Sequence, residues 1–368
     1  MAQNTLGRTL FPVCSSAGCL AIQRRTFSST VSKLKPPLPV FKPTASPELD
    51  GLLERFRNTL FIPRWLPLKH RKLITKQSQA TKLQENPITL KIGGKSDQSF
   101  TLKPIRLDQL PTKAETERVV ELMKTPEDWQ NLIPFLAGMQ FSGRKLSLRQ
   151  WEAIIRKAGL NGGEEAIYKA AVENHVTALS LKFPSLTLHL LRAIRRKAAD
   201  ADFKGQPVDD AVRQVEAVAR LLNSEAHTNS DLASDPKRLP EVIGAMLEIH
   251  AAKALNSYGG QDKDGKVRDF AQKLVSTWPL ANLTVPEHWA AANFQLFFAI
   301  PLWNGIKSAL QVHEIREDPE LKKKLVTRMA ELSKSIEQLM TKVEEAGKEQ
   351  TPAGLKEAQR YYQKSETQ

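Results

Sequence analysis

The side chains best suited to chemistry in this sequence are cations interleaved with aromatic rings over residues 55–76. Lysine and arginine neutralise phosphate groups, while aromatic rings and guanidinium planes stack on unpaired bases. The pattern predicts an RNA-binding segment; the alternative is a basic strip that keeps the protein soluble or completes its fold. The rings are Phe56, Phe61, Trp65 and His70. The candidate RNA-binding residues are Arg55, Arg57, Arg64, Trp65, Lys69, His70, Arg71, Lys72, Lys76 and Lys82.

Prolines set the expected shape of this segment. Pro63 and Pro67 interrupt it, and a proline inside a helix removes a backbone donor and clashes with the preceding turn. We therefore expect an extended chain that lies on another surface. Five prolines between residues 33 and 47 also favour a polyproline-like path. Together these features predict an extended, proline-rich and basic RNA-binding arm over residues 28–87.

The positive charge of the chain is concentrated in its first hundred residues. The 368 residues carry a formal net charge of +14. Residues 1–100 contain 16 Lys and Arg against 5 Asp and Glu, with no acidic residue between Glu54 and Glu85. Charge polarised in this way favours a polyanionic partner for this part of the chain.

A second cationic cluster lies near the C-terminal end of a helix expected over residues 185–200. Cations near a helix C-terminus interact favourably with the helix dipole. A structural role and a contact with RNA therefore both remain open for this cluster. Its members are Arg192, Arg195, Arg196 and Lys197.

Motifs for catalysis or metal binding are incomplete. Gly94-Lys95-Ser96 resembles the end of a phosphate-binding loop, but Thr89 stands where that loop needs its first glycine. Asp262-Lys263-Asp264-Gly265 resembles a calcium loop, but Ala271 stands where its bidentate glutamate belongs. The seven histidines lack the pairing at three to five residues that zinc-binding helices use. We therefore expect no enzyme activity, no metal, no cofactor and no small-molecule substrate.

The first residues have the composition of a mitochondrial targeting sequence. Residues 1–46 contain six Lys or Arg, no Asp or Glu, and many Ser and Thr, which is typical of a mitochondrial transit peptide. Within Arg24–Thr30, an aromatic residue lies two positions after an arginine, as in sites cut by a matrix peptidase. We expect cleavage after Phe27, with Arg25, Phe27 and Ser28 as the processing site. Residues 1–27 are then the transit peptide, and the mitochondrial matrix is the destination.

Both cysteines, Cys14 and Cys19, lie in this segment. Their removal would leave no thiol for a disulfide, a cysteine nucleophile or a thiolate-bound metal. No stretch approaches the roughly 20 consecutive apolar residues of a membrane-spanning helix, so no membrane span is expected.

The rest of the chain is predicted to be mainly α-helical. Alternating apolar and polar residues around Gly93-Gly94 predict a small β-hairpin over residues 88–110. Residues 111–316 follow a helical period and form pairs, at about 147–176, 185–200 with 207–223, and 239–257 with 265–277. Ser147 and Gln150 give the first of these pairs a capping-box signature. Successive pairs predict a repeat-like or solenoid body of helical hairpins.

Residues 317–368 are expected to form a long amphipathic helix and a tail. Apolar positions from Leu325 to Val343 step alternately by four and three residues, which gives a heptad-like stripe. So few heptads favour docking on the helical body or on a partner over dimerisation. The tail after Pro352 is expected to form one more, exposed helix.

This layout resembles the mitochondria-specific proteins of fungal mitochondrial ribosomes. The resemblance is carried best by Arg24–Thr30 and Arg55–Lys82. It implies a structural component of the mitochondrial ribosome that supports mitochondrial translation. It also implies that the basic arm binds ribosomal RNA and that the helical body contacts other mitochondrial ribosomal proteins.

Two alternatives stay open at the level of sequence. The hairpin Ser147–Val176 resembles a pentatricopeptide-type repeat, a family in which each repeat reads one base of single-stranded RNA. That resemblance implies an organelle RNA-processing or translation-activating factor. An assembly factor for a respiratory complex would use the same helical fold for protein contacts only, without RNA.

Overall fold

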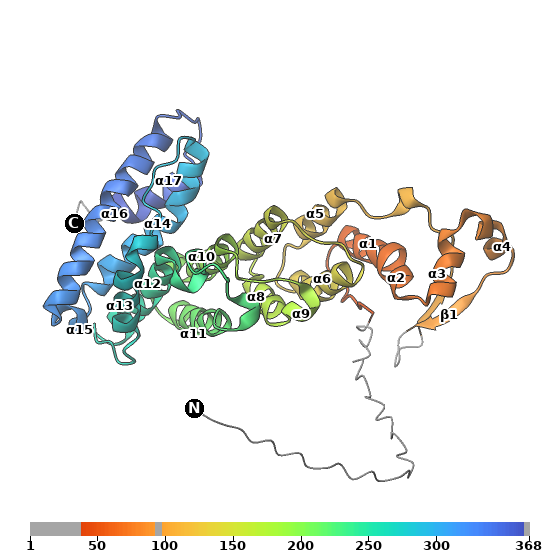
Figure 1. Ribbon diagram of the computed structural model, residues 1–368, viewed down its shortest axis with the longest axis horizontal. Helices are drawn as coiled ribbons and strands as arrows, with labels where there is room; N and C mark the ends of the chain where they lie inside the picture. Colours follow the sequence, from red (N-terminus) through yellow and green to blue (C-terminus); the bar gives the residue numbers. More distant parts are fainter. Residues whose placement is uncertain (1–37, 93–97, 364–368) are drawn as a thin grey trace, which may run out of the picture. The chain divides into compact units, whose positions relative to one another are not determined.

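The computed structural model describes residues 38–92 and 98–363 (Figure 1). These residues are mainly helical and contain one two-stranded antiparallel sheet, which confirms the predicted fold class. No helix among them combines the length and apolar character needed to cross a bilayer. The predicted transit peptide and its processing residues Arg25, Phe27 and Ser28 lie outside the described residues, as does the turn over residues 93–97.

The described part of the segment predicted to be extended, residues 38–87, is instead mostly helical, so that part of the prediction is wrong. Residues 38–46, 66–67, 76 and 86–87 lie outside its helices. Ser46 then caps α1 by accepting a hydrogen bond from the Leu49 N–H. The elements that follow are α1 (Pro47–Phe56), the π-helical turn η1 (Arg57–Phe61), α2 (Ile62–Trp65), α3 (Leu68–Thr75), the 3-10 turn η2 (Gln77–Gln79) and α4 (Ala80–Glu85).

Pro63 is accommodated because the helix widens just before it. The Ile62 N–H donates to the carbonyl of Arg57, five residues back, and this π-type spacing relieves the crowding that proline causes in an α-helical turn. Pro67 ends α2 instead, since the preceding Leu66 takes up extended angles of φ −60° and ψ 149°. The prolines therefore mark the boundaries of short helices and do not prevent helix formation.

The predicted β-hairpin is confirmed by two strands, β1 (Thr89–Ile92) and β2 (Gln98–Thr101). Their register pairs Thr89 with Thr101 and Leu90 with Phe100. Two strands alone are marginally stable in water. Leu90 and Phe100 pack against an apolar cluster that also holds α2, α3 and α4 together. That cluster consists of Ile62, Leu66, Ile74, Leu83 and Leu102.

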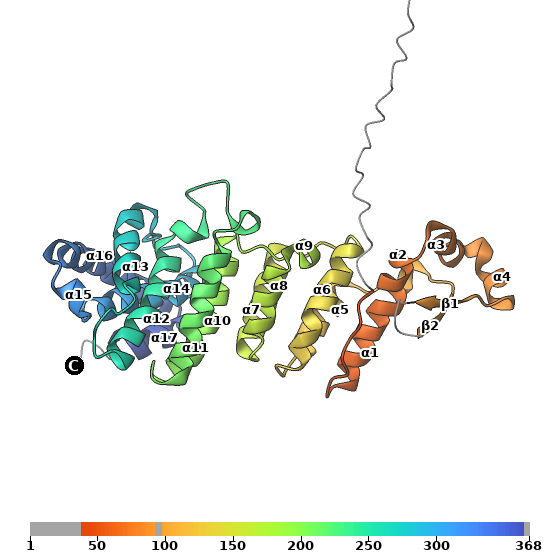
Figure 2. The same ribbon diagram turned by 90° about the horizontal axis from the view of Figure 1, so that it is seen from below.

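Helical pairs make up the rest of the described chain and confirm the predicted hairpin organisation (Figure 2). In the row α5, α7, α10, α12, α14, each helix packs against the next, while α8, α11, α13 and α16 pair with members of this row. The capping box of Ser147 and Gln150 is present at the start of α7. The elements are η3 (Leu107–Gln109), α5 (Lys113–Leu122), η4 (Asp128–Asn131), α6 (Leu132–Phe141), α7 (Leu148–Leu160), α8 (Glu164–Val172), α9 (Asn174–Thr177), α10 (Pro184–Asp200), α11 (Gln206–Leu221), η5 (Glu225–His227), η6 (Pro236–Arg238), α12 (Pro240–Ser257), α13 (Lys266–Thr277), η7 (Trp278–Leu280), α14 (Trp289–Ala309), α15 (His313–Arg316), α16 (Pro319–Glu344), α17 (Ala353–Ala358) and the π-helical turn η8 (Gln359–Gln363).

Helix α12 is buried on nearly every side and joins the two main apolar clusters. Met246 and Ile249 belong to the cluster that extends toward α1, whereas Leu247 and Ala251 belong to the cluster that extends to η8. A helix that is apolar all round needs neighbours on all sides. In α12 these neighbours include α10, α11, α13 and α14.

The C-terminal segment docks on its own chain. Helix α16 packs along α14 and buries Leu325, Leu332, Ile336, Leu339 and Val343 of the predicted stripe. The tail does form a further helix, α17, but it is not exposed as predicted, because it packs on α14 with several residues buried. The buried tail residues are Gly354, Leu355, Ala358 and Tyr362.

Candidate nucleic-acid interface

Half of the predicted RNA-binding residues lie exposed on the short helices that follow α1. Residues Arg64, Lys69, Lys72, Lys76 and Lys82 are all exposed and make no ion pair with any described residue. We call these five residues the basic surface. Its positive charge is not neutralised within the described part of the chain, so the surface suits an external polyanion.

Arg71 has a different position, although it lies between members of the basic surface in sequence. Its Nη2 donates to the carbonyl oxygens of Arg64 at 2.8 Å and Leu66 at 3.1 Å. Carbonyls in the last turn of a helix lack partners within the helix. Arg71 therefore stabilises the end of α2 from the following helix.

Arg55 and Arg57 also contact the protein itself. The Arg55 Nη1 lies 2.6 Å from Oε1 of Glu115, which connects α1 to α5. The Arg57 Nε donates to the carbonyl of Pro39 at 3.3 Å, and burial lowers the pKa of its guanidinium. These two arginines hold the N-terminal helices in place. The predicted RNA-binding residues therefore include some with a structural role and others that form the basic surface.

The aromatic residues of the segment are mostly committed to packing. Phe56 and Phe61 are 1% and 0% exposed, and their ring centroids lie 5.1 Å and 6.2 Å from that of Phe135. Base stacking by these two rings, as the sequence suggested, is therefore excluded. Trp65 and His70 are half-buried, and Trp65 packs against the apolar cluster beneath the basic surface.

The second cationic cluster, on α10, is similarly divided. Arg195 is buried and paired with Glu248 of α12 and Glu357 of α17. Lys197 pairs with the buried Glu164 of α8. Arg192 and Arg196 of the same cluster have side chains 30% and 48% exposed. The structure thus gives Arg195 a structural role and leaves Arg192 and Arg196 accessible.

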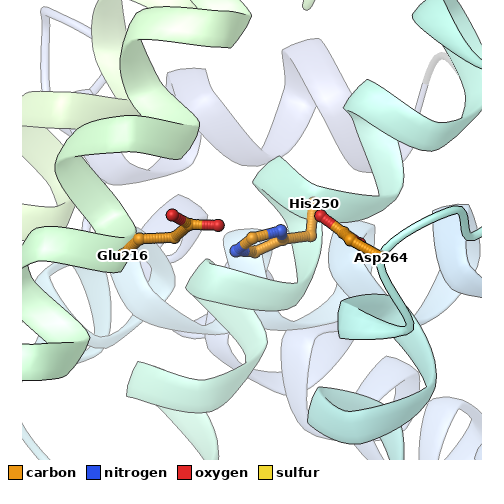
Figure 3. Close-up of side chains that lie close together, drawn as sticks. All are labelled: Glu216, His250 and Asp264. Carbon is orange, nitrogen blue, oxygen red and sulfur yellow. The ribbon is translucent and has the colours of Figure 1, made fainter.

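One set of metal-compatible side chains meets in the described residues: Glu216 of α11, His250 of α12 and Asp264 before α13 (Figure 3). Their ligand atoms lie within 4.8 Å of one another. His250 is 3% exposed, and its Nε2 has no hydrogen-bond partner among the described residues. Of this set, only Asp264 lies in a motif that the sequence analysis tested, the loop that resembles a calcium loop. Glu216 and His250 come from two other elements, so sequence spacing could not bring the three together.

The geometry of this set does not fit a metal closely. Bonds of about 2.1 Å would place tetrahedral ligand atoms about 3.4 Å apart, so the side chains would have to move closer. Asp264 also already accepts the backbone N–H of Lys266 at 3.2 Å. We therefore assign no metal to this cluster.

The fold and the basic surface define a class: a protein of stacked helical hairpins with a cationic surface for a polyanion. A family model for mitochondrial ribosomal protein mS27 (Mrp13) matches residues 25–364. The chain belongs to this family of mitochondrial ribosomal proteins. It is also 27% identical over 278 residues to the small ribosomal subunit protein mS27 of Neurospora crassa, a match that covers 70% of each chain.

Membership of the family makes the chain a structural component of the mitochondrial ribosome. This confirms the function implied by the layout of the sequence and favours it over the RNA-processing and assembly-factor alternatives. As a mitochondrial ribosomal protein, the chain has ribosomal RNA and other ribosomal proteins as its partners.

Proposed function

We propose that this chain is a protein of the small subunit of the mitochondrial ribosome and that it binds ribosomal RNA through the basic surface. The helical body then contacts neighbouring ribosomal proteins, the protein acts in the matrix, and its role is structural and not catalytic. The name of the Neurospora crassa relative, a small-subunit protein, supports the choice of subunit.

The basic surface is the observation that supports RNA binding most strongly. Lys69 and Lys72 are three residues apart on α3, so they lie on neighbouring positions of one helix face. Lys76 follows directly at the end of this helix. Like charges held this close repel one another, and an external row of phosphates would remove that repulsion.

The helices that carry these cations are held in place from the other side. The cluster of Ile62, Leu66, Ile74, Leu83 and Leu102 is almost completely buried beneath them. The cations are therefore presented by a packed scaffold, which lowers the entropy that the helices lose on binding.

A fourfold variant tests this function: Arg64→Ala, Lys69→Ala, Lys72→Ala and Lys76→Ala. Arg71 is left intact because it stabilises α2. The matched control removes four exposed cations of α16, with Lys322→Ala, Lys323→Ala, Lys324→Ala and Lys334→Ala. We expect the first variant to be lost from ribosomal particles in a gradient and the control to be retained, with equal thermal unfolding. Wild-type co-sedimentation of the first variant would contradict RNA binding by the basic surface.

Import and processing form a separate part of the proposal. The acid-free composition and the Arg25, Phe27 and Ser28 pattern support cleavage after Phe27. Mass spectrometry of the N-terminus of the mitochondrial protein should identify Ser28 as the first residue. An intact Met1 on the protein inside the organelle would contradict it.

A further inference from the structure

A cationic cleft lies between α7, α10 and the segment formed by α17 and η8. The cavity has a volume of about 340 Å³. Six cationic side chains and only two carboxylates, Asp200 and Glu357, line it. The cations are Arg156, Arg192, Arg195, Arg196, Lys356 and Arg360. Just outside the lining, Glu248 pairs with Arg195 and Asp202 lies 3.8 Å from Arg360. With these two carboxylates counted, the cleft has an excess of two positive charges.

The two carboxylates of the lining are shared among several cations and do not neutralise the cleft. Glu357 accepts a hydrogen bond from Arg195 at 2.6 Å and lies 3.7 Å from Arg192. Asp200 is likewise 3.8 Å from Arg196 and 3.7 Å from Arg360.

Two further cations of the lining are uncompensated. Arg156 and Lys356 are exposed and make no ion pair with any described residue. They lie on α7 and α17, so the unneutralised charge comes from both walls of the cleft.

The positive field of the cleft is also visible in its titratable groups. Burial lowers the pKa of Arg192; Glu357 opposes this change, and the neighbouring Arg195, Arg196 and Arg156 add to it. Burial also lowers the pKa of His189 to about 4; Glu152 opposes this change, and Arg192 and Arg156 add to it. His189 is therefore neutral at pH 7 and adds no further repulsion. An anion in the cleft would relieve the mutual repulsion of the arginines.

Aromatic rings hold part of this charge in position. The guanidinium carbon of Arg192 lies 3.5 Å from the ring centroid of Phe297. That of Arg360 lies 5.0 Å from the centroid of Tyr361. Stacking on a ring restricts a guanidinium group, and Arg360 is restricted further because its Nη2 donates to the carbonyl of Ala199 at 3.3 Å.

We propose that this cleft is a second RNA contact, in which Arg156, Arg192, Arg196, Lys356 and Arg360 bind the phosphodiester groups of single-stranded RNA. The proposal rests on the proposed function for the source of the RNA. Ribosomal RNA is a polyanion available to a mitochondrial ribosomal protein, and its phosphates suit a cleft lined by guanidinium groups.

Binding of a labelled 20-nucleotide oligouridine to the purified full chain tests the proposal. The variant Arg156→Ala/Lys356→Ala removes the two unpaired cations, and Lys322→Ala/Lys323→Ala is the matched control. Each lost phosphate contact reduces the salt slope of a single strand by about 0.7. We therefore expect a slope lower by about 1.4 and a binding constant about 25-fold weaker at 0.1 M salt. Arg156→Lys/Lys356→Arg should bind as the wild type does.

Two results would overturn the proposal. One is an affinity and salt slope for Arg156→Ala/Lys356→Ala equal to those of the control. The other is a loss of affinity for a polyglutamate peptide without any loss for oligouridine, which would make the cleft a site for acidic protein. Repeating the titration in the basic-surface variant separates the contributions of the two sites.

The same experiment distinguishes this proposal from the proposed function. If the wild-type chain sediments with ribosomes but the cleft variant binds oligouridine normally, only the cleft proposal fails. If the wild-type chain is absent from ribosomal particles, the proposed function fails, and the binding constants of the purified chain still report on the cleft.

Discussion

Arg195 and Glu248 form a two-pronged ion pair in the interior of the helical body. The Arg195 Nε lies 2.5 Å from Oε2 of Glu248, and its Nη2 lies 2.8 Å from Oε1. Their side chains are 4% and 1% exposed. The Arg195 Nη1 also donates to Oε1 of Glu357 at 2.6 Å. One guanidinium group therefore joins α10, α12 and α17.

Replacement of this arginine should destabilise the protein strongly. Arg195→Met removes the partner of a buried carboxylate, and removal of one member of such a pair costs about 3–5 kcal/mol. We expect a loss of this size in the free energy of unfolding, measured by urea denaturation at pH 7.5. The double variant Arg195→Met/Glu248→Met should recover most of it, since two apolar side chains replace the pair. A double variant as unstable as the single one would contradict a charge-based cost.

The stability of Arg195→Met should also depend on pH. Burial raises the pKa of Glu248, and Arg195 opposes that rise in the wild type. Without Arg195, the folded state binds a proton on Glu248 more tightly than the unfolded state does, so the variant gains stability as pH falls. The difference in unfolding free energy between Arg195→Met and the wild type should be smaller at pH 5.5 than at pH 7.5. A constant deficit across this range would contradict the assignment to Glu248.

Glycines at the contact of α12 and α14 provide a test of the packing. A Cβ on Gly305 would lie 2.5 Å from the carbonyl oxygen of Gly244 and 3.0 Å from the backbone nitrogen of Glu248. Backbone atoms cannot move aside easily, so Gly305→Ala should cost about 1–3 kcal/mol. Gly51→Ala in α1 is the control, because nothing lies within 4 Å of its Cβ. It should stabilise the protein by about 0.5–1 kcal/mol. Equal unfolding midpoints for the two variants would argue against this close contact.

Neighbouring residues on α3 should separate structure from RNA binding. Arg71→Ala removes hydrogen bonds to the carbonyls of Arg64 in α2 and of Leu66 directly after it, and bonds from charged donors contribute about 1.5–3 kcal/mol each. Hydrogen exchange should therefore become faster over residues 62–85 in this variant. Lys72→Ala should leave exchange unchanged and weaken RNA binding. The reverse pattern would show that the roles of these two residues are exchanged.

His189 should make the protein less stable in mild acid. Its pKa of about 4 in the folded state lies below the ordinary value of 6.5, so the unfolded state takes up the proton first as pH falls. The contribution of neutral His189 to the free energy of unfolding is complete above pH 6.5 and is lost as the pH falls from 6.5 to 4. About 2 kcal/mol of it is lost by pH 5. His189→Gln should reduce the fall in unfolding free energy from pH 7.5 to 5 by this amount. His175→Gln, at an exposed position of α9, should not, and equal pH dependence in both variants would refute the assignment.

The helical pairs were predictable because local signals agree with the final packing. Ser147 and Gln150 form the predicted capping box, and the helices that begin at Pro184 and Pro240 start within one residue of the predicted positions 185 and 239. The apolar stripe of α16 is likewise buried where its period indicated. Each of these features depends on residues only a few positions apart.

The missed features depend on contacts between distant parts of the chain. Phe56 and Phe61 pack against Phe135, about 75 residues later. No local pattern near residue 60 predicts that contact. The tail is held by Asn293 of α14, whose side-chain oxygen accepts the N–H groups of Gly354 and Leu355 at 2.8 and 3.1 Å. Sequence patterns identify the cations, but only the fold separates Arg71 from Lys72.

Sedimentation of the endogenous protein from a mitochondrial lysate tests whether the chain is a component of the small ribosomal subunit. The gradient is run once with magnesium and once with EDTA, which separates the ribosomal subunits. The chain should migrate with the intact ribosome in magnesium and with the small subunit in EDTA, at one copy per particle. Migration near the top of both gradients, or with the large subunit in EDTA, would contradict its assignment to the small subunit.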